Sequence, residues 1–270
     1  MKAKYFAFPY VGWLALFVVA PIVLVVIYAF TTRDGAATLA NFYAMGSYTS
    51  VFVRSFWLSA VSTVICIIIG YPIAYILARE GLSAQRIMIM LIMLPMWMNF
   101  LLRTYAWMSI LENTGLLNRF LRFIGLRELR IINTPIAVVI GMVYNFLPFM
   151  ILPIYSVIVK IDSHTIEAAQ DLGANSASVF RKLIIPLSLP GVLSGITMVF
   201  VPGVSTFVIS QLLGGGKEML LGDLIELQFL GAAYNPHTGS SISLVMMIIV
   251  IVFMYIMNKF GEGEERAFSI

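Results

Sequence analysis

Charged residues are scarce in this sequence, and cysteine is almost absent. Only 11% of the 270 residues are charged, against about 25% in a typical soluble domain, so the charges are too few to cover a globular surface. Cys66 is the only cysteine and lies inside an apolar run, which excludes a disulfide within the chain and a thiolate metal site. The formal net charge is +4 without a basic stripe, which argues against nucleic-acid binding.

Apolar residues are what the sequence has in abundance. They make up 60% of the chain, and the mean hydropathy is +0.96. A helix needs about 20 consecutive apolar residues to cross the hydrocarbon core of a bilayer. The sequence therefore predicts an all-α membrane protein with six transmembrane helices, at about 9–30, 55–78, 87–110, 134–159, 186–212 and 240–258.

The basic residues set the expected orientation. Lys2 and Lys4 precede the first span, and no charged residue follows until Arg33. This interval is longer than the apolar core of a signal peptide, about 7–15 residues, so we expect a retained first helix that begins in the cytoplasm. Nine Lys and Arg then lie on the cytoplasmic side and seven outside, which favours this orientation by a narrow margin. Both termini are expected to be cytoplasmic.

The stretch at about 162–186 interrupts the apolar pattern with polar and small residues. Asp162 and Ser163 suit the N-cap of a helix, and Gly173 suits the left-handed position just beyond its end. Asn175 or Ser176 then caps a second short helix. We expect this second helix to stop at the proline that closes the stretch, so the pattern predicts a helix, a glycine turn and a helix on the cytoplasmic side.

The first of these helices carries a distinctive face. Glu167 and Asp171 are four residues apart and share one side of the helix. Ala168 and Ala169 are small enough to let another backbone approach closely. Such a face suits a basic groove on a partner protein, while a solvated loop that only links two spans is the alternative interpretation.

The motif in this stretch resembles a known one. Glu167-Ala168-Ala169, Gly173 and the residues 183–186 (LIIP) are similar in type and spacing to the EAA loop of ABC importer permeases, whose pattern ends in I-x-L-P. The resemblance implies that the loop docks into a cleft of an ATP-hydrolysing subunit and carries its motion to the membrane. The implied coupling residues are Glu167, Ala168, Ala169, Asp171 and Gly173.

The similarity extends over about residues 9–258. It is carried by Leu94–Trp107, Tyr144–Tyr155, Glu167–Gly191 and Leu213–Phe229, which resemble the first permease subunit of spermidine/putrescine importers. It implies a type I ABC importer (MetI-like) permease fold with cytoplasmic coupling helices, in a multi-pass protein of the bacterial inner membrane. The implied partners are an ATP-binding subunit dimer, a second homologous permease, an extracellular substrate-binding protein, the lipid bilayer and a polyamine substrate.

The resemblance also implies a division of the chain. Residues 1–53 form an N-terminal transmembrane helix and an external loop. Residues 54–258 form an ABC type-1 transmembrane domain, and residues 259–270 form a cytoplasmic tail.

ATP hydrolysis by this chain is not expected. Leu213–Lys217 reads LGGGK, but the lysine is followed by Glu218 and position 211 is not glycine, so the phosphate-loop pattern fails. No catalytic residue and no cofactor is assigned to the chain, and ATP and Mg are expected on the partner ATPase.

No metal site is predicted either. Five methionines crowd the first half of the third span (Met88, Met90, Met93, Met96 and Met98), and thioethers suit Cu(I). Because no cysteine or histidine joins them, we interpret them as flexible apolar filler.

Candidate pathway residues lie near prolines in the predicted spans. Each proline removes a backbone hydrogen bond, and such a break is tolerated in lipid where it is buried in protein or lines a wet cavity. Pro202-Gly203 falls in the middle of the predicted fifth span, where it either lines the pathway or only kinks the helix. Aromatic faces suit a polycation. The candidates are Trp97, Asn99, Tyr105, Tyr144, Pro202, Phe207 and Gln211.

Acidic residues are missing from all six predicted spans, which bears on a cationic substrate. Glu112, Asp223 and Glu226 lie outside or at the external boundary, so carboxylates for a polyamine are expected from the second permease or the binding protein. Arg103 is the one charge within a span, and we expect it to reach the external interface or to pair with an acid.

Three other functions remain as alternatives. An ABC permease for ferric iron or an organic ion would share the coupling loop. A stand-alone secondary transporter would need ion-coupling acids within its spans, which are absent. A membrane-embedded enzyme would need a nucleophile and base pair that no span provides.

Overall fold

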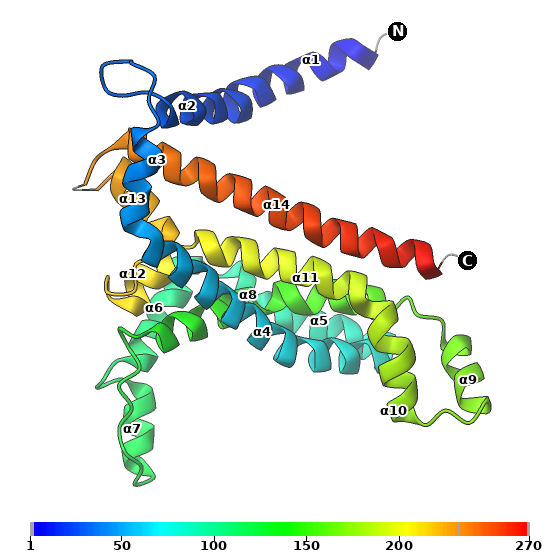
Figure 1. The fold of residues 1–270 in the computed structure, drawn as a ribbon. Helices are drawn as coiled ribbons and strands as arrows, with labels where there is room; N and C mark the ends of the chain where they lie inside the picture. Colours follow the sequence, from blue (N-terminus) through cyan, green and yellow to red (C-terminus); the bar gives the residue numbers. More distant parts are fainter. Residues whose placement is uncertain (1–2, 232, 269–270) are drawn as a thin grey trace.

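The computed structural model describes residues 3–231 and 233–268 and is built almost entirely of helices (Figure 1). Within these residues, five stretches are long and apolar enough to cross a membrane, and a sixth span is completed by a pair of helices with a sharp bend between them. The prediction of an all-α protein with six spans is therefore confirmed, with one span broken. The five unbroken spans are Pro9–Ala29, Ala40–Arg79, Pro135–Ile158, Ser176–Ser205 and Pro236–Gly261.

The N-terminal helix stands beside the rest of the bundle. It consists of α1 (Ala3–Leu14), a π-helical turn η1 (Ala15–Val19) and α2 (Ala20–Ala29). Its α2 part packs on α14 (Pro236–Phe268), while α1 diverges from the other helices (Figure 1). Most of its apolar surface is exposed, so in a membrane this surface faces lipid or another protein.

The core is formed by three helices that pack on one another. These are α4 (Thr49–Arg79), which follows the short helices α3 (Ala40–Ala44) and η2 (Met45–Tyr48), together with α8 (Pro135–Ile158) and α11 (Ile185–Ser205). Gly191 and Gly195 lie four residues apart on α11 and face α8. Small residues at this spacing let membrane helices approach closely, because little hydrophobic force drives helices together in lipid.

The third predicted span, 87–110, is not one helix, and that prediction is wrong. The chain forms α5 (Leu82–Trp97) and α6 (Phe100–Leu111), separated by Met98 and Asn99, and the stretch Phe100–Phe123 that begins with α6 is bent by 90° from α5. Met98 and Asn99 both adopt extended backbone, and the Asn99 side chain accepts hydrogen bonds from the Leu101 and Leu102 amides, at 2.8 and 3.4 Å. A new helix therefore starts at Asn99, capped by its side chain.

The fifth predicted span, 186–212, is also wrong at its end. Helix α11 stops at Ser205, and α12 (Val208–Gly214) begins after Thr206 and Phe207. Pro202-Gly203 thus lies in the last turn of α11, not in the middle of a span. Helix α13 (Leu221–Phe229) follows and packs on α14. Segment 111–133, which joins α6 to α8, contains α7 (Leu116–Phe123).

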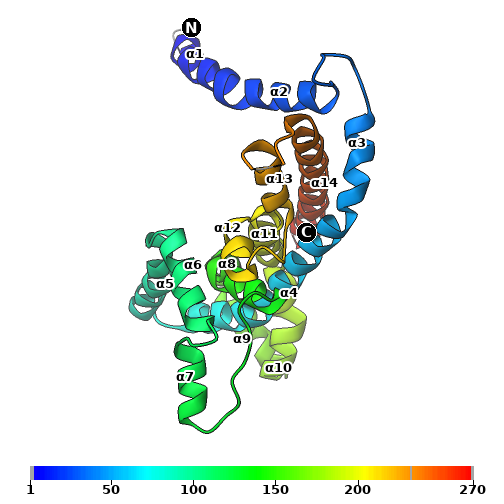
Figure 2. The same ribbon diagram turned by 90° about the vertical axis from the view of Figure 1, so that its left-hand side faces the viewer.

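Different helices gather at the two ends of the bundle (Figures 1 and 2). The free ends of α1 and α14 lie at the same end as α9 (Ser163–Asp171) and α10 (Ser176–Val179), while α7, α12 and α13 lie at the opposite end. Lys2 and the side chains of Lys4 and Arg266, which entered the orientation argument, lie outside the described residues.

The glycine contact between α11 and α8 gives a stability prediction. A Cβ at Gly191 would lie 2.8 Å from the Pro153 carbonyl oxygen and 3.1 Å from the Ile154 Cα, and neither backbone atom can move aside easily. Gly191→Ala should lower the free energy of unfolding by about 1–3 kcal/mol, measured as a lower Tm in detergent.

Gly12→Ala is the matched control, because Gly12 lies within α1 and a Cβ there meets nothing within 4 Å. This control should keep or slightly raise the Tm, since alanine favours helix more than glycine does. Equal Tm values for the two variants would contradict the close contact.

Candidate functional site

Helix α9 is built as the sequence predicts. The Asp162 side chain caps it by accepting a hydrogen bond from the His164 amide, at 3.0 Å. The helix closes at Gly173, whose φ is +87° and whose amide donates to the Gln170 carbonyl. A Cβ at Gly173 would meet nothing within 4 Å, so glycine is favoured there by backbone conformation and not by space.

The exposed face of α9 combines charge with small and apolar side chains. Glu167, Ala168 and Asp171 are exposed, while Ala169 is half-buried. Leu172 is 90% exposed and follows Ala168 by four residues, on the same side of the helix. Sequence reasoning did not include Leu172, although its spacing from Ala168 could have indicated it. An exposed leucine beside two acids is a surface suited to a partner protein.

The segment after Gly173 runs directly into the membrane core. Asn175 caps α10 by accepting from the Ser178 amide, at 2.8 Å. A π-helical turn η3 (Phe180–Ile184) then joins α10 to α11 without a break. The expectation that Pro186 ends the second short helix is therefore wrong. The physical reason is the wider turn, which relieves the clash between a proline ring and the preceding carbonyl groups; η1 precedes Pro21 in the same way.

An aromatic cluster holds this turn against α4. The Phe180 ring meets Tyr71 and Tyr75 edge to face, with ring centres 5.9 and 5.0 Å apart. The Tyr71 hydroxyl and the Ser188 hydroxyl share a hydrogen bond of 2.7 Å, and the Arg79 guanidinium donates to the Tyr75 hydroxyl at 3.0 Å. The two ring contacts and the hydrogen bond between Tyr71 and Ser188 thus join η3 and the start of α11 to α4, while the bond from Arg79 lies within α4.

A cavity of about 200 Å³ separates the base of α9 from the bundle. It lies between the end of α4, the end of α8 and the half-buried Ile166 of α9. Helix α9 therefore touches the bundle lightly, whereas α10 and η3 are packed on it.

The predicted pathway residues lie at the two helix breaks or close to them. Trp97 is exposed at the bend between α5 and α6, and Tyr105 is exposed on α6. Asn99 uses its side-chain oxygen to cap α6. Tyr144 packs edge to face on Trp107, with ring centres 5.2 Å apart. Pro202 lies in the last turn of α11, and Phe207 lies in the break between α11 and α12. The Gln211 amide donates a hydrogen bond to the Glu226 carboxylate.

The structure places a buried acid next to this second break. Asp223 on α13 is 5% exposed, and one of its oxygens accepts from the Leu220 amide at 2.7 Å, while the other has no partner among the described residues. Burial raises the pKa of Asp223 from 3.8 to about 6, although the nearby Ser210 side chain and then the Leu220 amide lower it. An acid three residues into a helix is a capping signal in the sequence, but its burial depends on how α13 packs on α14.

Among the described residues, Arg103 lacks the acidic partner that was one of the two expectations for it. It is buried on α6, with its guanidinium carbon 5.9 Å from the centre of the Phe100 ring. No acid pairs with it in the described part of the chain, and its Nε has no hydrogen-bond partner there.

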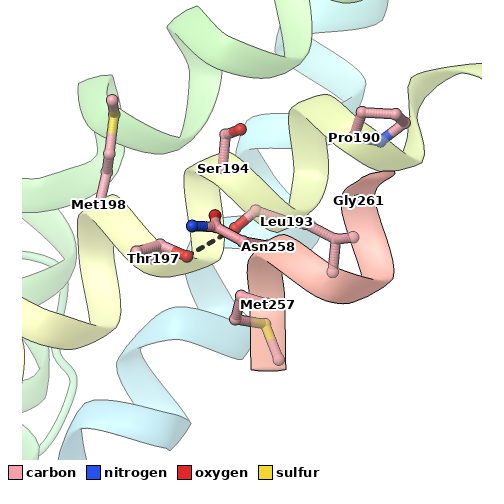
Figure 3. Close-up of a pocket in the computed structure, with 8 residues that line it drawn as sticks. All are labelled: Pro190, Leu193, Ser194, Thr197, Met198, Met257, Asn258 and Gly261. Carbon is pink, nitrogen blue, oxygen red and sulfur yellow. Dashed lines mark hydrogen bonds between the residues drawn. The ribbon is translucent and has the colours of Figure 1, made fainter. Parts of the chain in front are cut away.

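A pocket between α11 and α14 is lined by other residues. Its volume is about 310 Å³, and its polar side chains are Ser194, Thr197 and Asn258 (Figure 3). Thr197 donates to the Leu193 carbonyl in its own helix, at 3.0 Å. None of the seven predicted pathway residues lines this pocket. Among the described residues, no group of three His, Cys, Asp or Glu side chains could hold a metal ion.

Comparison with known proteins decides the family. Residues 42–260 match the family model described as "Binding-protein-dependent transport system inner membrane component". The chain belongs to this family. The permease is thus a non-catalytic, multi-pass component of the inner membrane in a binding-protein-dependent ABC importer.

Relatives of similar length support this membership. A protein named "Spermidine/putrescine transport system permease protein PotB" from Haemophilus influenzae is 39% identical over 259 residues, which cover 90% of the permease and 89% of the relative. The protein of the same name from Escherichia coli strain K12 is 36% identical over 270 residues, covering 94% and 98%.

Solved structures show the same fold. A chain of a bacterial ABC transporter that imports the acidic polysaccharide alginate matches with a TM-score of 0.82 at 14% identity, covering 96% of the permease and 94% of that chain. A chain of the inward-facing MetNI methionine ABC transporter matches with a TM-score of 0.61 at 17% identity, covering 82% and 97%. The predicted type I importer fold is confirmed.

Proposed function

We propose that this chain is the permease subunit of an ATP-driven importer in which α9 docks into an ATPase subunit. The observation that carries the proposal is the face formed by Glu167, Ala168, Asp171 and Leu172, which is presented outward at one end of the bundle with few contacts beneath it. The glycine turn at Gly173 fixes where the next helix starts. This turn and the EAA-like spacing support a coupling role for Glu167, Ala168, Ala169, Asp171 and Gly173.

The geometry supports a route for motion from α9 to the far end of the molecule. A displacement of α9 passes through Gly173 to α10, and then through η3 into α11 without a break in the helix. The cluster of Phe180 with Tyr71 and Tyr75 moves α4 with it. Helix α11 ends at the break before α12, next to the buried Asp223. Alternating access follows when this break opens and closes.

The same proposal fixes the orientation and the partners. The end with α9, α10 and both chain ends lies in the cytoplasm, where ATP and Mg are bound by a dimer of ATPase subunits. A second homologous permease covers exposed apolar faces of the membrane-spanning helices, and an extracellular binding protein delivers substrate to the end with α12 and α13. In this scheme residues 1–53 form the first helix and external loop, 54–258 the transport domain, and 259–270 the tail.

The proposed substrate is a polyamine, spermidine or putrescine. The proposal is supported by the names of the relatives at 36–39% identity, whose lengths the chain matches. Asp223 and Glu226 add carboxylates beside Gln211, at the end that the binding protein would face. A polyamine is held by charge pairing and by aromatic faces. Ferric iron or a small organic ion is the alternative substrate class.

Docking through α9 gives the first prediction here. Glu167→Arg places a positive charge on the face proposed to meet a basic groove, which costs several kcal/mol at a buried interface. Copurification of the ATPase with the permease should fall roughly tenfold or more, and uptake should fall with it.

Ser83→Arg is the control, since Ser83 is exposed in the first turn of α5 and so adds the same charge outside α9. It should retain ATPase binding. Normal ATPase copurification and uptake with Glu167→Arg would contradict docking through this face.

Substrate identity is tested by uptake in cells. In a strain that lacks this chain, uptake of radiolabelled spermidine and putrescine should be lost, and the wild-type chain should restore it. Glu167→Arg should not restore it, because this variant is expected to lose ATPase docking. Its result therefore tests the coupling proposal, while the result of the deletion tests the substrate. Unchanged polyamine uptake in the deletion strain would contradict the polyamine assignment and leave the coupling proposal untouched.

A further inference from the structure

Helix α7 carries an apolar face that nothing in the described chain covers. Leu116, Phe120, Phe123 and Ile124 recur at the spacing of one helix face, and all four are exposed, Phe123 to 87%. Such a surface is costly in water. A short helix with its apolar side turned outward indicates that something else covers that side.

The polar side of α7 is firmly held. Asn118 is buried, its amide nitrogen donates to the Asn113 and Leu129 carbonyls at 3.0 and 2.9 Å, and its oxygen accepts from the Leu129 amide at 2.8 Å. Arg122 forms an ion pair with Glu128 across the same loop. These contacts fix the rotation of α7, so the exposure of its apolar face is built into the fold.

The placement of α7 fits a membrane surface. It projects sideways from the end of the bundle that carries α12 and α13, and it runs across the direction of the long helices α11 and α14 in both views (Figures 1 and 2). A helix that lies across the spans at one end of the bundle lies along the plane of the membrane interface, where amphipathic helices bury their apolar face.

The charge of the segment fits phosphate groups. Segment 111–133 contains four arginines and two glutamates, a net charge of +2. Arg119 lies on α7 beside the apolar face, and arginine pairs well with phosphate oxygens. An apolar face bordered by an arginine matches the boundary between acyl chains and anionic headgroups better than it matches open water.

We propose that α7 is an interfacial anchor that inserts Leu116, Phe120 and Phe123 into the leaflet at this end of the bundle, the outer one in the orientation proposed above, and binds an anionic lipid phosphate through Arg119. The anchor holds α6, and with it the bend at Asn99, at a fixed depth in the membrane. This role concerns the lipid bilayer and does not depend on which substrate is carried.

A single fluorophore tests the proposal. Cys66 is fully buried, and Cys66→Ala removes it so that one cysteine can be introduced at a chosen position. An environment-sensitive probe is attached to Phe123→Cys, and as a control to Arg130→Cys, which is exposed in the same loop but outside α7. The full chain, purified with the subunits that assemble with it, is placed in nanodiscs of phosphatidylcholine and phosphatidylglycerol with brominated acyl chains.

The probe at position 123 should emit at a shorter wavelength than the probe at position 130. Brominated lipid should also quench the fluorescence at position 123 about twofold more strongly, or better, than that at position 130. Arg119→Gln combined with Phe123→Cys should weaken the quenching most in nanodiscs rich in phosphatidylglycerol. Equal quenching at the two positions would overturn the proposal. So would a probe at position 123 that is shielded from aqueous iodide but not quenched by lipid, because a protein would then cover α7.

Discussion

The structure depends on a helix that continues through a proline. Pro186 has no amide hydrogen to donate, and its ring crowds the carbonyl groups before it. The π-helical turn at Phe180–Ile184 widens the helix just ahead of this proline, so α10 and α11 remain one body of 30 residues. Without this continuity, α9 and α10 would be a flexible appendage. With it, a displacement at the surface of the bundle becomes a displacement of a core helix that packs on α8 and α4.

The two ends of the molecule are built on opposite principles. At the α9 end, helix continuity and the cluster of Phe180, Tyr71 and Tyr75 make a stiff connection. At the other end, helices break at Met98–Asn99 and at Thr206–Phe207, and the breaks are held by caps and by single hydrogen bonds such as Gln211 to Glu226. A gate that is moved from a distance needs a rigid connection at the α9 end and flexible helix breaks at the other end. Small movements of the rigid part are then concentrated at the breaks.

The features of the fold that depend on neighbouring residues in the sequence could be predicted. Apolar length gave six spans, and the caps at Asp162 and Asn175 and the left-handed Gly173 lie where the sequence placed them. The sharp bend at Asn99 could not be predicted from apolar length, since Met98 and Asn99 barely lower the hydropathy of the span. The role of Pro186 was misjudged because a proline alone does not reveal a π turn ahead of it. The burial of Asp223 depends on contacts between α13 and helices far away in the chain.

The central claim is that motion passes from α9 to the membrane through η3 and its contact with α4. The most direct test is the amount of substrate taken up per ATP hydrolysed, measured in proteoliposomes for the assembled importer with Phe180→Ala. This change removes both edge-to-face contacts and leaves the face of α9 intact. The account predicts that the ATPase still binds and hydrolyses ATP while uptake per ATP falls several-fold. An unchanged ratio of uptake to hydrolysis would contradict it.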